Sequence, residues 1–136
     1  MENKLPFGQE RRKFSRLRLR LAVVYQVDKP LTLRMQIGDR EIMATALDLS
    51  EGGMAISTNY DLPLETELLI KFTLFKVDNE GRVSFYGPME IIGAVRSSAA
   101  IEANLHRLGI FFTNIDDKDK AEIINFVKIA LKKTEQ

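Results

Sequence analysis

Apolar and polar residues alternate along much of the chain, most regularly after residue 16. From Leu17 to Val27 every second residue is apolar, and Arg18 and Arg20 lie between the first of them. A period of two places alternate side chains on opposite faces of an extended backbone. Residues 17–27 are therefore predicted to form a strand with one buried and one solvated face.

The same pattern recurs in short segments that Gly, Pro, Asn or Asp separate. Gly38-Asp39-Arg40, for example, is a plausible hairpin turn. Because no strand–helix–strand rhythm appears before residue 114, these segments favour an antiparallel barrel or sandwich. Further strands are expected at residues 31–37, 41–47, 54–58, 68–76, 82–86, 89–97 and 105–113, with a loop rich in Ala and Ser before the last of them.

The last part of the chain follows a helical pattern. Asn114 and Asp116 are N-cap candidates, acids follow in the first turn, and residues 117–133 are predicted to be helical. Apolar side chains cover most of this helix. One face of the helix is expected to cover the barrel. The remaining apolar surface is expected to contact either a second copy, which would give a homodimer, or a target protein. The alternative is that the barrel buries the whole helix deeply.

Composition is that of an ordinary soluble domain. The 136 residues suffice for one domain with a core, and 45% are hydrophobic and 29% charged. Cysteine is absent, which excludes disulfides and thiolate chemistry. No apolar run approaches the roughly 18 residues of a membrane span, and residues 1–10 look like a flexible lead-in. We therefore expect a cytoplasmic protein without membrane insertion.

One segment is far more basic than the rest of the chain. Residues 11–20 contain six Arg or Lys and no acid, whereas the whole chain has a formal net charge of +1, which leaves −5 elsewhere. A local positive field on an otherwise acidic protein indicates an anion site. Arg12 and Arg16 could grip phosphate oxygens or lie on an aromatic base; a merely solvated basic arm is the alternative.

A second unusual segment runs from Asp48 to Gly53. In an extended backbone Asp48 and Ser50 share a face, and the glycines at 52 and 53 allow close backbone approach. A carboxylate can accept two parallel hydrogen bonds from N1 and the exocyclic amino group of guanine, and a serine hydroxyl can donate to phosphate or sugar. The same residue types also form plain hairpin turns, which is the alternative.

The order and spacing of these two segments resemble a known family. Arg12-x-x-x-Arg16 followed by Asp48-x-Ser50-x-x-Gly53 is similar to the paired RxxxR and [DN]xSxxG motifs of the PilZ domain, the bacterial receptor module for cyclic di-GMP. The resemblance covers residues 9–133 and continues through the later strands, at Gly93, Val95, Leu108, Gly109, Ile110 and Phe112.

This resemblance implies a mainly β fold, a six-stranded antiparallel (split) β-barrel with a C-terminal α-helix. The PilZ domain would comprise residues 11–133. Within it, the arginine arm would take residues 11–16, the barrel 17–113 and the helix 117–133.

The motif match also implies a role for each motif residue. Arg12 and Arg16 would hold phosphates and stack on guanine, and Asp48 would read a guanine edge. Ser50 and Gly53 would complete the pocket. The ligand would be cyclic di-GMP itself, with no cofactor and no metal.

The resemblance adds two further arginines to the site. Arg11, directly before the first motif, is similar to a basic residue that accompanies binding of an intercalated ligand dimer rather than a single molecule. Arg96 is similar to a family position that packs on the base; a solvated strand arginine is the alternative.

Other functions fit the sequence less well. His106, the only histidine, belongs to no nucleophile–base pair, so no catalytic residue is predicted. A nucleic-acid partner would require a more basic surface and exposed stacking aromatics, whereas Phe111 and most other aromatics fall where core is expected. The remaining alternative is a protein-interaction adaptor with a non-binding PilZ-like barrel that acts through its apolar C-terminal helix. For the receptor, we expect ligand to order the arm and signal to an unknown protein target in motility, biofilm or exopolysaccharide control.

Overall fold

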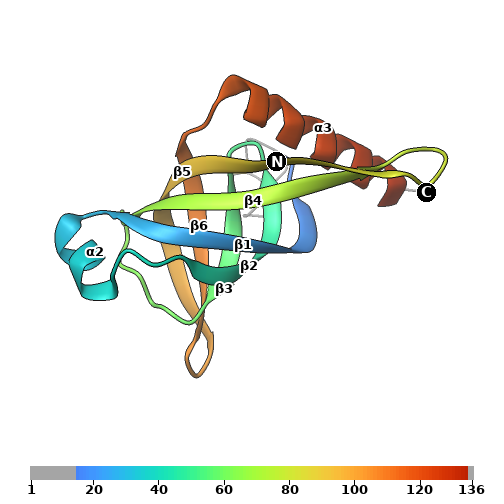
Figure 1. Cartoon of the computed structure of the whole chain (residues 1–136). Helices are drawn as coiled ribbons and strands as arrows, with labels where there is room; N and C mark the ends of the chain where they lie inside the picture. The colour runs from blue at the N-terminus through green and yellow to red at the C-terminus, as the bar shows by residue number, and fades with distance from the viewer. Residues whose placement is uncertain (1–14, 135–136) are drawn as a thin grey trace, which may run out of the picture.

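Six β-strands close into an antiparallel barrel, as expected from the sequence (Figure 1). The structure, a computed structural model, describes residues 15–134. Around the ring the strand order is β1-β2-β3-β6-β5-β4, and β4 pairs with β1 to close it. The strands are β1 (Leu17–Lys29), β2 (Ile42–Ser50), β3 (Gly53–Thr58), β4 (Glu67–Val77), β5 (Val83–Glu102) and β6 (Leu105–Asn114), and the helices are α2 (Leu31–Ile37) and α3 (Asp117–Thr134).

Alternate side chains fill the interior of the barrel, and on β2 the buried parity changes at the register shift between Ala46 and Asp48, so that Ala46 and Leu49 both belong to the core. On β1, Tyr25 is buried together with the valines on either side of it, whereas Arg18 and Arg20 on the opposite face are exposed. Burial raises the pKa of Tyr25, and its hydroxyl is satisfied by a hydrogen bond of 2.8 Å with Thr58 Oγ1. The alternation in the sequence thus identifies the buried face of β1.

The expectation of a strand at residues 31–37 is wrong, because these residues form the short helix α2. The Arg34 N–H donates to the Pro30 carbonyl at 3.0 Å, and the Gly38 N–H donates to the Arg34 carbonyl at 2.8 Å. A strand needs a neighbour, and β1 already pairs with β2 on one edge and with β4 on the other. The closed ring therefore has no position for this segment.

The two strands expected at residues 82–86 and 89–97 form the single strand β5, which begins at Val83. Gly87, at φ +125, lies within it opposite a register shift of β4. The glycine therefore marks a local irregularity rather than an end of the strand. The loop expected after residue 97 is also strand as far as Glu102, because it continues to pair with β6.

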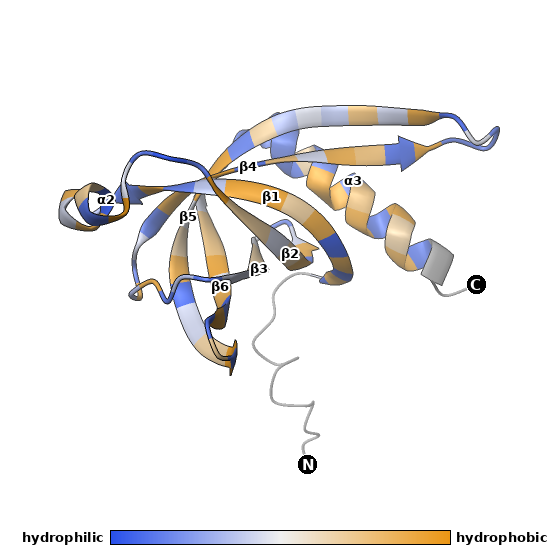
Figure 2. Cartoon of the chain, turned by 60° about the horizontal axis from the view of Figure 1, so that its bottom comes forward, coloured by the Kyte–Doolittle hydropathy of each residue, from blue (hydrophilic) through white to orange (hydrophobic). Residues whose placement is uncertain are grey.

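The outer parts of β4 and β5 form a two-stranded ribbon that runs beside α3 (Figures 1 and 2). The Tyr86 hydroxyl donates to Asp119 Oδ1 at 2.8 Å, and Phe75 meets Phe126 edge to face with 6.2 Å between ring centroids. Elsewhere on α3, Ile123 is fully buried in the barrel core. One face of α3 therefore covers the barrel, as expected, and the ribbon covers part of the rest. Neither helix in residues 15–134 is both long and apolar enough to cross a membrane.

The contact between Tyr86 and Asp119 predicts an unusually high pKa for Tyr86. The hydrogen bond to Asp119, followed by desolvation, raises the pKa of Tyr86 from 10.0 to about 12. Because this folded-state pKa lies above the unfolded-state value, the contact stabilises the fold below pH 10.0 and loses that effect as the pH rises towards about 12. Tyrosinate absorbance should show a step near pH 12 that disappears in Tyr86→Phe and moves down in Asp119→Asn. An unchanged step in Asp119→Asn would contradict the contact.

Candidate functional site

The carboxylate of Asp48 lies at the centre of the site predicted from the sequence. Asp48 is near the end of β2 and on the outer face of the barrel, since its neighbour Leu49 belongs to the core. Only 6% of Asp48 is exposed. Its Oδ1 accepts a hydrogen bond of 2.9 Å from the Ala55 backbone N–H, which fixes the carboxylate to β3. A charge this deeply buried requires a paired partner.

Two arginines from different parts of the chain pair with this carboxylate and form the Asp48 cluster (Arg16, Asp48 and Arg107). Arg16, next to the start of β1, places Nη1 3.1 Å from Oδ1, and Arg107 of β6 places Nη2 3.2 Å from Oδ2. Their side chains are 35% and 46% exposed, so both guanidiniums also reach solvent. Arg18 lies opposite Asp48 in the β1–β2 register and is exposed too. The cluster therefore has a net positive charge that an anion can approach.

Ser50 and Gly53 shape the turn that follows Asp48. The Ser50 hydroxyl is buried, accepts from the Gly52 N–H at 3.2 Å and donates to the Gly53 carbonyl at 3.4 Å. A Cβ on Gly53 would lie 2.0 Å from the carbonyl oxygen of Ile110 on β6. Both residues therefore have structural reasons to be there, and their contact with a ligand stays a prediction.

Arg96 lies against an aromatic ring on the same side of the barrel. Its guanidinium carbon is 4.9 Å from the ring centroid of Phe111, and its Nε is 3.4 Å from Glu65 Oε2. Phe111 pairs with Gly53 across β3 and β6, and 46% of it is exposed. Half of the Arg96 side chain is exposed as well. The pair therefore offers a solvent-facing cation–aromatic surface beside the motif turn.

Between the Asp48 cluster and this pair, the outer face of the sheet carries only small side chains. Asp48 pairs with Ala55, Ala55 with Gly109, and Gly109 with Ser97, which makes one row across β2, β3, β6 and β5. Ala55 and Gly109 alternate with core residues and so face outwards, with Ala55 covered to all but 1% of its surface. A Cβ on Gly109 would lie 2.3 Å from Ser97 Oγ, so the floor is closely packed. A floor without long side chains, with charges and an aromatic ring around it, suits a planar base that carries an anionic group.

The structure thus brings together most of the predicted residues that it describes. Arg16 and Asp48 are in direct contact, Ser50 and Gly53 form the next turn, and Arg96 lies across the small-residue floor. Arg11 and Arg12 lie outside the described residues.

Two site residues were missed in the sequence. Phe111 was placed with the core, but it alternates with the buried Ile110 and Phe112 and must face outwards. The same alternation assigns Arg107 to the outer face of β6. The alternation does not predict that β6 pairs with β3, or in which register. That pairing is what places Arg107 near Asp48.

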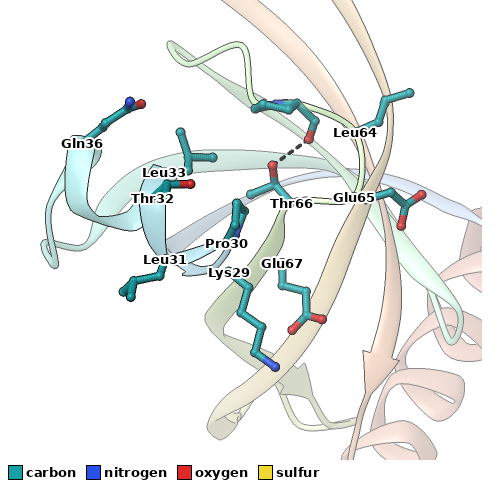
Figure 3. A pocket seen from close by; sticks show the side chains of 11 residues that line it. Lys29, Pro30, Leu31, Thr32, Leu33, Gln36, Leu64, Glu65, Thr66 and Glu67 are labelled. Carbon is teal, nitrogen blue, oxygen red and sulfur yellow. Dashed lines mark hydrogen bonds between the residues drawn. The ribbon is translucent and has the colours of Figure 1, made fainter.

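A groove of about 800 Å³ lies at the other end of β1, between α2 and the β3–β4 connection (Figure 3). Leu31 and Leu64 line it and expose 64% and 59% of their surface. None of the predicted site residues that the structure describes lines this groove; Arg96 only reaches its rim through the ion pair with Glu65. The predicted site therefore lies on the outer face of the sheet and is separate from this groove.

Comparisons with known proteins agree with the fold. The family model of the PilZ domain matches residues 10–128. The Inhibitor of motility (MotI/DgrA) of Bacillus subtilis superposes with a TM-score of 0.69 at 16% identity, covering 93% of this chain and 54% of the other. The MrkH–c-di-GMP complex of K. pneumonia superposes with a TM-score of 0.63 at 14% identity, covering 93% of this chain and 54% of the other. The PilZ domain of YcgR from Escherichia coli with c-di-GMP superposes with a TM-score of 0.55 at 15% identity, covering 93% of this chain and 98% of the other. The chain thus spans about half the length of the first two. No curated protein gives a sequence match.

At 16% identity or less, the solved structures establish the fold alone. The family match is more specific, because it covers most of the chain and includes both Arg16 and the turn from Asp48 to Gly53. The closed six-stranded ring and the helix after it have the arrangement that the resemblance implied. The chain therefore belongs to the PilZ domain family.

Proposed function

We propose that this protein is a receptor for cyclic di-GMP, the molecule present in the structures of MrkH and of the YcgR domain. The observation that carries the proposal is the buried Asp48 carboxylate held between two solvent-facing arginines. A carboxylate matches the hydrogen-bond donors on the edge of guanine, and guanidiniums match phosphate oxygens. Cyclic di-GMP offers both groups within one small molecule.

The surroundings of Asp48 suit the rest of this ligand. A guanine that bonds Asp48 would lie on the floor made by Ala55 and Gly109, with its far side towards Phe111 and Arg96. Its phosphates would meet Arg16 and, by the motif, Arg12. Arg11 would extend the positive surface and favour an intercalated ligand dimer.

The signal would be the ordering of residues 11–16 over the bound ligand. Arginines close together repel one another, and ligand phosphates would neutralise them and hold the arm against the barrel. A partner protein would then meet a different surface. The receptor would be cytoplasmic, and its output would be the control of motility, biofilm formation or exopolysaccharide production.

A specific observation keeps the adaptor alternative as a second candidate. Phe85 on the β4–β5 ribbon is 74% exposed, and Ile129 on α3 is 44% exposed. Such apolar side chains are typical of a protein contact surface. An adaptor of this kind would bind its target equally well with and without cyclic di-GMP.

Calorimetric titration of cyclic di-GMP into the protein tests the receptor proposal. We expect binding in the unchanged protein and an affinity about 10- to 100-fold weaker in Arg16→Ala, because a hydrogen bond to a charged group contributes about 1.5–3 kcal/mol. Arg34→Ala is the matched control, since Arg34 is similarly exposed and pairs with Asp39 at 2.8 Å outside the site. Two ligands per protein would support the role of Arg11. No heat, and no change of melting temperature at saturating ligand, would refute the receptor.

A further inference from the structure

Arg107 is the member of the Asp48 cluster that no motif predicts, and its backbone is firmly held. It lies within β6, opposite Ser57 of β3 on one edge and Ala99 of β5 on the other. Arg16, by contrast, precedes the first residue of β1. The two guanidiniums that share the Asp48 carboxylate therefore differ in freedom, because one belongs to the barrel and the other to the segment before it.

The two oxygens of Asp48 also differ in how many hydrogen bonds they already accept. A carboxylate offers about four acceptor positions, two on each oxygen. Oδ1 uses both, for the Ala55 N–H at 2.9 Å and for Arg16 Nη1 at 3.1 Å. Within residues 15–134, Oδ2 uses one, for Arg107 Nη2 at 3.2 Å. Counting the donors of residues 15–134, one position on Oδ2 is therefore left for a ligand, and none on Oδ1.

Recognition of guanine by two parallel hydrogen bonds needs one free position on each oxygen. Oδ2 meets this requirement while it keeps Arg107. Oδ1 meets it only if it loses one of its two donors, and the Ala55 N–H is fixed because Ala55 pairs with Asp48 in the β2–β3 ladder. Arg16 is the donor that can leave.

We infer that guanine displaces Arg16 from Asp48, whereas Arg107 stays and positions the carboxylate for the base. This inference rests on the proposed function and adds to it a different role for each of the two arginines. Arg16 moves from the carboxylate to a ligand phosphate. The same side chain therefore occupies the Asp48 acceptor in the free protein and binds the ligand in the complex. Arg107 is a positioning residue that keeps the nearly buried carboxylate paired and in one plane when Arg16 has gone.

The inference is tested with cyclic di-GMP and its inosine analogue, which lacks the exocyclic amino groups. In the unchanged protein we expect the guanine ligand to bind about 10- to 100-fold more tightly, the effect of one hydrogen bond to a charged acceptor. In Arg107→Gln this preference should fall to within about threefold, because the carboxylate is no longer held in place to receive the amino group. Arg107→Lys, which keeps one charged donor, should restore part of the preference, and Arg34→Gln should leave it unchanged.

Each outcome of this titration decides a different point. Equal weakening of both ligands in Arg107→Gln, with the preference intact, would mean that Arg107 supplies only positive charge, and it would overturn the inference while the receptor stands. An unchanged protein that binds neither ligand would overturn the proposed function and the inference with it. If Arg107→Gln does not fold, Arg107→Lys decides alone: an unchanged preference overturns the inference, and a reduced one supports it.

A spectroscopic measurement separates the two arginines directly. In protein with nitrogen-15-labelled arginine, the Nε–Hε resonances of Arg16 and Arg107 can be assigned with the Arg16→Ala and Arg107→Lys variants. Saturating cyclic di-GMP should shift the Arg16 resonance strongly and leave the Arg107 resonance close to its position in the free protein. A large shift of Arg107 with a stationary Arg16 would show the opposite exchange and refute the inference.

Discussion

Alanine in place of Gly53 is expected to destabilise the barrel by about 3 kcal/mol or more, the upper range for overpacking a closed interior. The added Cβ would lie 2.0 Å from the Ile110 carbonyl oxygen and 3.3 Å from the Cα of Phe111. Both atoms belong to the backbone of β6, so no side-chain rotation can relieve the contact. The strands β3 and β6 would have to separate at their first paired residues. Chemical denaturation of Gly53→Ala and of the unchanged protein measures the difference in the free energy of unfolding.

Gly81→Ala is the matched control for this substitution. Gly81 lies at φ +83 with nothing within 4 Å of an added Cβ, so alanine there meets backbone strain but no steric contact. We expect a loss of about 1–2 kcal/mol, the cost of a left-handed conformation for a residue with a side chain. A Gly53→Ala protein as stable as Gly81→Ala would mean that β3 and β6 are not packed as closely as the structure shows.

A large loss of stability in Gly53→Ala would show that the residues of the Asp48-x-Ser50-x-x-Gly53 motif have two different physical roles. The turn after Asp48 needs Gly53 so that β3 can approach β6, and it needs the Ser50 hydroxyl to join the two sides of the turn. Asp48, in contrast, is a charge on the outer face that accepts the Ala55 N–H and pairs with Arg16 and Arg107. Ser50 and Gly53 would then serve the construction of the barrel, whereas the proposed recognition of cyclic di-GMP would depend on Asp48 and the arginines around it.

The sequence predicted this barrel well where local pattern and tertiary structure agree. The strict alternation after Leu17 identifies β1, and the helical pattern after Asp117 identifies α3. Residues 31–37 show the limit of such reasoning, because they alternate as a strand does but have no strand edge to pair with. Alternation describes the two faces of a segment, and the presence of a partner depends on the whole ring.

The site was predictable to the extent that its residues lie in short motifs. Arg16 and Asp48 are 32 positions apart, and the sequence placed both in one candidate site because each belongs to a family motif. Arg107 is 59 positions from Asp48 and belongs to no motif, so only the pairing of β3 with β6 reveals it. A single sequence does not predict strand register, so it does not predict contacts that depend on that register.

Asp48→Ala is expected to weaken cyclic di-GMP binding by more than about 100-fold, since both hydrogen bonds to the guanine edge and the charge behind them are lost. The same change leaves the Ala55 N–H without its acceptor and Arg16 and Arg107 without their shared partner. A loss of about 1–3 kcal/mol in stability should therefore accompany it. Calorimetric titration and chemical denaturation measure the two effects on the same samples.

Asp48→Asn separates binding from stability, because the amide retains one oxygen for the Ala55 N–H but turns one acceptor of the carboxylate into a donor. We expect a smaller loss of stability than in Asp48→Ala, because the Ala55 N–H keeps its acceptor although Arg16 and Arg107 lose the charge they pair with. Binding should be about tenfold weaker, an intermediate value in keeping with the Asn that the [DN] position of the motif accepts. The decisive comparison is the order of the three proteins. If Asp48→Ala bound cyclic di-GMP within about fivefold of the unchanged protein, the carboxylate would be no part of the ligand site, because a single hydrogen bond to a charged group is worth more than that. The arginines would then hold phosphate alone, and the protein would not distinguish guanine from other bases.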